Sequence, residues 1–240
     1  PVSGTTGEGL PELMSTVDDL LKVTEPRKDL GRPRLPIDRS FTMPGFGTVV
    51  TGTLIDGSLN VGQEIELVLA SKTTRVRNLQ THLHKLDHAS PGSRVAANLT
   101  GVANQTIDRG EVLTNPGWLR PTTAVDVELR IVSDCPQPVK HNMFVILHTG
   151  SSERLVRVRL LESEVAEPGK STWAQFKLSN PLAVVKGDYF VIRSNRNTLG
   201  GGTIVDPHAR RHRRMHLPTL GRLAIMKHGS NREILLNNIQ

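Results

Sequence analysis

The sequence predicts a mainly β fold: two consecutive small antiparallel β-barrels, with a short N-terminal helix and a helical C-terminal tail. Two blocks of short β-branched runs, each with about six runs separated by turn signals, cover residues 34–117 and 118–208. Blocks of this size favour two closed barrels over one sandwich. At 240 residues the chain is long enough to bury a core in each block.

Residues 8–23 have the pattern of an amphipathic helix. The apolar residues recur at a spacing that places them on one helical face: Leu10, Leu13, Met14, Val17, Leu20 and Leu21. Pro11 suits the first turn of such a helix. The stretch that follows carries three prolines among alternating charges, which is typical of a stiff linker. We therefore separate an N-terminal segment, 1–25, from a linker, 26–33.

The first strand run of the 34–117 block poses a question about its side chains. Because side chains alternate along a strand, one face should carry Leu35, Ile37, Arg39 and Phe41. Three of these four residues are apolar and one is an arginine, while Asp38 falls on the opposite face. The residue pattern alone favours an ordinary salt bridge between Asp38 and a basic neighbour.

The composition changes sharply after Asp206. Residues 209–240 begin with a basic run and continue at helical spacing through Leu220, Leu223, Ala224 and Lys227. Ser230 or Asn231 suits the N-cap of a further helix. We expect this tail to be the start of a helical domain that the chain does not complete.

The charge balance favours a polyanionic partner. Thirty Lys and Arg against 23 Asp and Glu give a formal net charge of +7, and a basic excess is typical of nucleic-acid binding, although a solvated basic surface gives the same balance. Aromatic residues are scarce, with two Trp, one Tyr and five Phe. Because proteins that read unpaired bases use aromatic stacking platforms, we expect backbone contacts to folded or double-stranded RNA.

Motifs for catalysis or metal binding are absent or weak. The sequence contains neither a G-x-x-x-x-G-K-S/T phosphate loop nor a G-x-S-x-G nucleophile motif. His82, His84 and His88 are close in sequence, but with no nearby cysteine or carboxylate pair we expect no metal site. Gly200–Thr203 lies between two strand runs with no helix after it, so we expect a turn or a close backbone approach there rather than an anion site. Cys135 is expected to be a structural thiol.

The same sequence carries a few signals of cellular location. The single cysteine cannot form an internal disulfide, which fits a reducing cytosol. No apolar run approaches the roughly 18 residues that a membrane span needs, and the N-terminus is not a signal peptide. The chain begins at Pro1 without Met, so we expect a cytoplasmic piece of a longer protein with no membrane partner.

Several motifs together resemble one family. The N-terminal "PVSGTTGEGLPEL" is similar to the end of a translational GTPase domain, with Ser3, Gly4 and Thr5 in the guanine-contacting loop and Gly in place of the usual Ala. "DRSFTMPGFGTVVTGT" resembles the second domain of the elongation factor Tu group. Together with "PGSRVAANLTG" and "GGGTIVDPHARRHRR", these motifs resemble the bacterial selenocysteine-specific elongation factors, members of the translational GTPase family.

This resemblance implies a division of the chain by role. Residues 1–25 would be the C-terminal remnant of the GTPase domain. The first barrel, 34–117, would carry an aminoacyl pocket, and the second, 118–208, would contact tRNA, as in elongation factor Tu domains 2 and 3. Residues 209–240 would begin a winged-helix region.

The resemblance also implies site residues. Matching motif by motif, the pocket for the selenocysteine group falls on Asp38, Arg39 and Arg94. A selenol is more acidic than a thiol and arrives as a selenolate, which weakly hydrated guanidinium groups suit. Asp38 would orient an arginine or hold the aminoacyl amine. The candidate tRNA contacts on the second barrel are His148, Arg154, Arg193 and Arg196.

The partners implied are selenocysteinyl-tRNA, the ribosome and, through domains beyond this chain, a hairpin in selenoprotein mRNA. The full-length family member would be a GTPase that uses GTP and Mg²⁺. We expect this chain to bind no cofactor and to have no enzymatic activity, because it has no phosphate loop. Two alternatives stay open: a fragment of a general elongation or initiation factor, and a non-translational RNA-binding barrel module.

Overall fold

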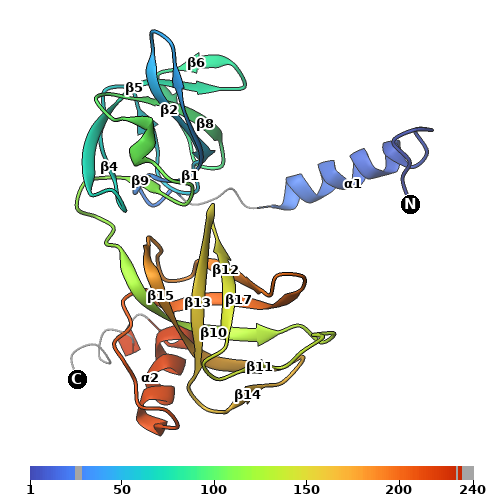
Figure 1. Ribbon diagram of the computed structural model, residues 1–240. Helices are drawn as coiled ribbons and strands as arrows, with labels where there is room; N and C mark the ends of the chain where they lie inside the picture. The colour runs from blue at the N-terminus through green and yellow to red at the C-terminus, as the bar shows by residue number, and fades with distance from the viewer. Residues whose placement is uncertain (25–28, 231, 234–240) are drawn as a thin grey trace.

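The described part of the chain forms two β-barrels and two α-helices, and the first barrel lies above the second in the view of Figure 1. The computed structural model describes residues 1–24, 29–230 and 232–233. The first barrel contains β1 (Arg34–Met43), β2 (Gly47–Thr53), β3 (Leu59–Asn60), β4 (Glu64–Leu67), β5 (Lys72–Thr81), β6 (His84–Leu86), β7 (His88–Ala89), β8 (Arg94–Leu99), the short helix η1 (Asn104–Thr106) and β9 (Val112–Thr114). The second contains β10 (Thr122–Ile131), β11 (Val139–Lys140), β12 (Phe144–Thr149), β13 (Ser152–Leu160), β14 (Val165–Ala166), β15 (Ser171–Leu182), β16 (Tyr189–Arg193) and β17 (Thr198–Asp206).

Both barrels are closed rings of six antiparallel strands. In the first, the order β4-β9-β1-β2-β8-β5 returns to β4 through the β4–β5 pairing, and β6 extends β5 outside the ring. In the second, the ring runs β10-β15-β13-β12-β16-β17 and closes between β17 and β10. The predicted fold class, two small antiparallel barrels with a helix at each end, is confirmed.

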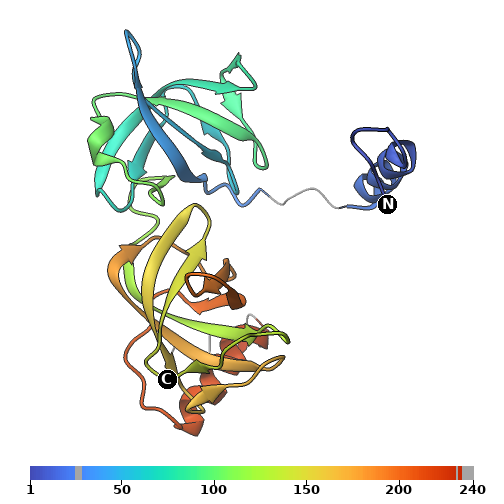
Figure 2. The same cartoon turned by 45° about the vertical axis from the view of Figure 1, so that its right-hand side comes forward.

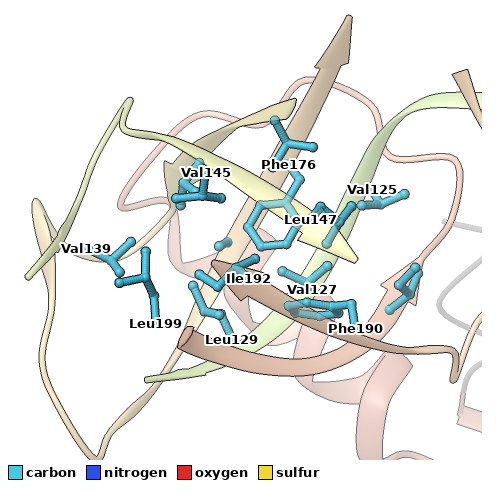
Figure 3. Packing of buried hydrophobic residues seen from close by; sticks show 14 of the residues in the cluster. Val125, Val127, Leu129, Val139, Val145, Leu147, Phe176, Phe190, Ile192 and Leu199 are labelled. Atoms are coloured by element: carbon cyan, nitrogen blue, oxygen red, sulfur yellow. The ribbon is translucent and has the colours of Figure 1, made fainter. Parts of the chain in front are cut away.

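Each barrel is filled by its own apolar core. The alternation of the strands turns their aliphatic side chains inward, and in the second barrel Phe176 meets Phe190 edge to face with ring centroids 5.2 Å apart (Figure 3). The first core contains no aromatic residue among its buried members and is built mainly from leucine, valine and isoleucine. Period-2 patterning therefore explains both interiors.

Strand β1 contains a β-bulge at Asp38. Residues 37 and 39 pair with consecutive residues of β2, so Asp38 is an extra residue in the ladder. A bulge of this kind shifts the alternation of side chains beyond it. Leu35 and Ile37 are fully buried, whereas Arg39 and Phe41 are exposed. The expectation that all four side chains share one face is wrong, because the uninterrupted alternation that it assumed is broken at Asp38.

The glycine run of β17 allows close approach to both neighbouring strands. A Cβ added at Gly202 would lie 1.9 Å from the Glu128 carbonyl oxygen, and one at Gly200 would lie 2.4 Å from that of Arg130. Strand β17 pairs with β10 on one side and β16 on the other. The close backbone approach predicted for this segment is confirmed.

The two barrels are in direct contact. Arg34 of β1 donates two hydrogen bonds to the Asp188 carboxylate at 2.6 and 2.8 Å, and both side chains are largely buried. Beside this pair, an apolar cluster joins Val112 of the first barrel to Leu119 of the connecting segment and Ala183 of the second. The segment between the barrels is therefore part of their interface.

The helices differ in what covers them. Helix α1 (Leu10–Val23) has no buried residue and stands apart from both barrels (Figures 1 and 2). Helix α2 (Leu217–His228) buries Leu223 and Met226 against the second barrel. After α2, Ser230 and Glu233 exchange hydrogen bonds as in a capping box. Asn231, the other predicted cap, lies outside the described residues.

Candidate functional site

An ion pair on the outer wall of the first barrel joins two of the predicted pocket residues. The Arg94 guanidinium, at the start of β8, donates to both carboxylate oxygens of Asp38, with Nη2 and Oδ1 2.8 Å apart. Thr51 of β2 donates its hydroxyl to the same Oδ1 at 2.8 Å. The pair is partly accessible, since the side chain of Arg94 is 47% exposed and that of Asp38 27%. A bidentate contact fixes the plane of the guanidinium group as well as its position.

The bulge explains why Asp38 can make this contact. An extra residue on β1 re-aims its side chain, and Asp38 reaches Thr51 on β2 and Arg94 on β8, across three adjacent strands of the ring. The Thr81 hydroxyl donates to the Arg94 carbonyl at 2.7 Å and helps to hold the start of β8. Thr51 was not predicted as a site residue, and a polar residue on the strand facing the Asp-Arg dipeptide is the signal that points to it.

Arg39 lies next to this pair on the same exposed face. Its backbone pairs with Thr51, and its charge acts on Asp38. The hydrogen bond from Arg94 is the main cause that lowers the pKa of the Asp38 carboxyl, and the charges of Arg94 and Arg39 lower it further. Within the described residues Arg39 has no hydrogen bond or ion pair. Two arginines and one aspartate leave a net charge of +1 at this site.

The predicted tRNA contacts on the second barrel do not form one cluster. His148 and Arg193 face outward from the neighbouring strands β12 and β16, and Arg196 lines the same hollow as Arg193 in the loop that follows. Arg154 belongs to the other face of β13, because it pairs with the buried Leu147. Its guanidinium group lies near the Pro181 carbonyl, with a distance of 3.4 Å. The four residues therefore do not share one surface.

The predicted guanine-contact residues form a compact turn before α1. The Ser3 amide donates to the Glu8 carbonyl and the Gly7 amide to the Ser3 carbonyl, both at 2.9 Å. The Thr6 amide donates to the Ser3 hydroxyl at 3.2 Å. Gly4 and Thr5 are exposed at the tip of this turn.

The other residues considered for chemistry have structural surroundings. Cys135 packs against the second core and directs its thiol at the Gln137 carbonyl, 3.0 Å away. His82 and His84 lie at the β5–β6 hairpin, whereas His88 on β7 faces Asn60 with the ring Nδ1 3.0 Å from the amide oxygen. Across the described ranges, no three His, Cys, Asp or Glu side chains gather as a metal site. No helix in those ranges combines the length and apolar character that a membrane crossing needs.

Comparison with known proteins connects this geometry to a family. Residues 47–114 match the model of elongation factor Tu domain 2, and residues 124–211 match the β-barrel domain of the selenocysteine-specific elongation factor. Over its whole length the chain is 39% identical to the selenocysteine-specific elongation factor of Desulfomicrobium baculatum. The chain is a homologue of selenocysteine-specific elongation factors. It spans 38% of the length of that relative.

A solved structure supports the same assignment. The apo form of the translation elongation factor SelB from Methanococcus maripaludis superposes with a TM-score of 0.74 and 25% sequence identity, over 85% of this chain and 49% of that one. Both matched models are barrel domains of elongation factors. The resemblance read from the sequence motifs is therefore confirmed at the level of the family.

Proposed function

We propose that the two barrels are the aminoacyl-binding and tRNA-binding parts of a GTP-dependent factor that delivers selenocysteinyl-tRNA to the ribosome at recoded stop codons. The observation that carries this proposal is the Asp38–Arg94 pair with Arg39 beside it. The names of the relatives agree with it. A mRNA hairpin would be bound by domains beyond this chain.

The charges of the site match a monoanion. Asp38 orients Arg94 and neutralises one of the two arginines, so the +1 that is left equals the charge of one selenolate with opposite sign. A guanidinium group stays protonated and is weakly hydrated, which suits a soft anion in a partly dry site. Arg39, which has no hydrogen bond or ion pair in the described part of the chain, is the residue that would meet the selenolate.

The charge of the site can also distinguish selenocysteine from serine, which the size of a pocket does only weakly. Serine and cysteine are close in shape to selenocysteine, and a pocket that judges size alone discriminates by only about 1–3 kcal/mol. A neutral seryl group would leave the net charge of the site unpaired on binding. The site therefore rejects serine through the loss of an ionic contact.

GTP and Mg²⁺ do not fit the residues present. The turn at Ser3 to Thr5 could contact only a base, and the sequence holds no phosphate loop. We therefore assign nucleotide binding to a GTPase domain outside this chain. Isothermal calorimetry with GTP and Mg²⁺ should show no saturable binding to these 240 residues, and a saturable isotherm would contradict the assignment.

The proposal is tested by comparing selenocysteinyl-tRNA with the same tRNA carrying serine, on the full-length factor in its GTP form. Arg94→Ala should weaken binding of the selenocysteinyl form by roughly 1.5–3 kcal/mol, the value of a hydrogen bond to a charged group. Binding of the seryl form should change much less. Arg77→Ala, which removes an exposed arginine from β5 of the same barrel, is the matched control. Equal wild-type affinity for both forms would contradict the proposal.

A further inference from the structure

The outer wall of the second barrel contains a hollow lined by cations. It lies over β10, β13 and β15 and is closed on one side by the chain that follows β17. The side chains that give it positive charge are Arg157, Arg159, Lys177, Arg211 and Arg214. His141 and polar residues complete the lining, which contains no aromatic ring other than that histidine.

The strands place three of these cations on one face. Arg157 and Arg159 are two residues apart on β13, so both point outward while Val156 and Val158 fill the core. Lys177 on β15 is directly opposite Arg157 in the antiparallel ladder. Like charges directly opposite each other destabilise a sheet. On its other side, Arg157 faces Phe144, and its guanidinium carbon lies 6.0 Å from the centroid of that ring.

A buried network holds the tail that supplies the other two arginines. The fully buried Asp126 carboxylate contacts His212 Nε2 at 2.5 Å and accepts a hydrogen bond from the Gln175 amide at 2.9 Å. The same amide group donates to the Arg210 carbonyl at 2.8 Å. Arg159 donates to the Gln175 side-chain oxygen at 2.5 Å and to the His212 carbonyl at 3.2 Å. The tail is therefore fixed against the wall, with Arg211 and Arg214 beside the strand cations.

Few carboxylates compensate this charge. The Glu164 carboxylate forms an ion pair with the Arg214 guanidinium, with Oε1 and Nη2 2.6 Å apart. The Asp126 carboxylate contacts His212 and not one of the five cations. Among the described residues, Arg157, Lys177 and Arg211 have no carboxylate partner. Two buried nitrogens of this lining, Arg157 Nε and His141 Nδ1, have no hydrogen-bond partner among the described residues.

The charged groups of the hollow also act on one another. Burial lowers the pKa of the Arg159 guanidinium, and the charges of Arg211, Arg214 and Arg157 lower it further. Burial likewise lowers the pKa of His141, with Arg214 as the next cause. A bound anion would offset these repulsions.

We propose that this hollow binds successive backbone phosphates of a double-stranded RNA segment. The three cations without a carboxylate partner, Arg157, Lys177 and Arg211, exceed what one small anion needs. Neighbouring outward residues on a strand stand about 7 Å apart, so such cations form rows that suit a chain of charges. No Phe, Tyr or Trp, the aromatic platforms that unpaired bases require, lines the hollow; Phe144 beside it is already in contact with the Arg157 guanidinium. The hollow lies over β10, β15 and β13, whereas His148 and Arg193 lie on β12 and β16; the two surfaces meet where Arg157 on β13 faces Phe144 on β12. This inference rests on the proposed function in one respect: it takes RNA to be the polyanion that binds.

The test measures binding of an RNA duplex of about 20 base pairs to this 240-residue chain by fluorescence anisotropy, between about 50 and 200 mM salt. The triple variant Arg157→Gln, Lys177→Gln, Arg211→Gln should raise the Kd about tenfold or more at low salt. It should also lower the slope of log K against log salt by about 2–3, because each neutralised phosphate contributes about 0.9. The Arg157→Lys variant, which keeps the charge, should keep the slope.

The matched control removes three exposed cations from the first barrel: Arg75→Gln, Arg77→Gln and Lys85→Gln. Its Kd should change about threefold or less, since only the overall charge is altered. An equal loss in both triple variants, or unchanged affinity in the first, would overturn the proposal. Binding of a glutamate-rich peptide as tight as that of the RNA would also overturn it. The duplex carries no aminoacyl group, so these results are independent of whether the Arg94 pocket discriminates selenocysteine from serine.

Discussion

Each barrel is a ring of six strands, but the charged side chains on their outer walls are arranged differently. On the first, Asp38 neutralises Arg94 and leaves a small, directed site with one net positive charge. On the second, Arg157, Lys177 and Arg211 lack a carboxylate partner within the described residues and spread positive charge over a wall. The first arrangement suits one defined anionic group, and the second suits a phosphate backbone, which is recognised without regard to sequence.

The difference also appears in how the sites are built. The first site depends on a strand irregularity, the bulge at Asp38, and it joins strands of one barrel. The second depends on a tail that crosses the wall and is held by Asp126. The bulge therefore sets the position of the Asp38 carboxylate, whereas the contact between Asp126 and His212, distant in sequence, holds the tail that completes the cationic hollow.

The largest expected effect comes from breaking the network beneath the second site. Asp126→Ala removes a fully buried carboxylate and leaves His212 and Gln175 without their acceptor. We expect a loss of about 3–5 kcal/mol in the free energy of unfolding of this barrel. Urea denaturation followed by circular dichroism measures the loss. Asp134→Ala, at an exposed turn, should change stability by about 0.5 kcal/mol or less, and equal losses in both variants would refute the role of the network.

A smaller effect is expected where the two barrels meet. Asp188→Ala leaves the Arg34 guanidinium largely buried without its carboxylate, which should cost about 1.5–3 kcal/mol. Because the pair joins the barrels, the variant should also separate their unfolding into two transitions in calorimetry. A single unchanged transition would show that the apolar cluster around Leu119 couples the barrels without help.

The smallest effect concerns the pH dependence of the first site. The lowered pKa of Asp38 means that its ion pair stabilises the fold above the usual Asp range, and that this contribution is lost as the pH falls through the lowered value. Since the pair is partly exposed, we expect about 1 kcal/mol or less. The stability difference between wild type and Asp38→Asn should be present at neutral pH and vanish in acid. A difference that persists unchanged in strong acid would contradict this ion pair.

Much of the fold could be predicted from the sequence because period-2 patterning is local. The run through Val125, Val127 and Leu129 alternates with polar residues and is buried as expected. Asp126, between two of these residues, should be exposed by the same pattern, yet it is fully buried. The tail that covers it lies more than 80 residues further along the chain, and no local pattern reports such a contact.

The candidate site could be predicted in composition but not in geometry. Asp38 and Arg94 were matched by motif, and the structure brings them together. The bulge that turns Arg39 outward is a property of strand pairing, so the alternation of the single strand gave the wrong face. Arg154 was grouped with His148 because the stretch that holds both resembles a tRNA-contacting strand pair, although the register places Arg154 on the inward face of its strand.

One measurement tests the division of roles between the barrels most directly. Binding of selenocysteinyl-tRNA and seryl-tRNA to the full-length factor is compared in wild type, Arg39→Gln and Arg157→Gln. Arg39→Gln should weaken the selenocysteinyl complex about tenfold or more and leave the seryl complex nearly unchanged, because only the selenolate meets that charge. Arg157→Gln should weaken both complexes by the same factor. If Arg39→Gln also weakens both complexes equally, the first barrel does not read the aminoacyl group.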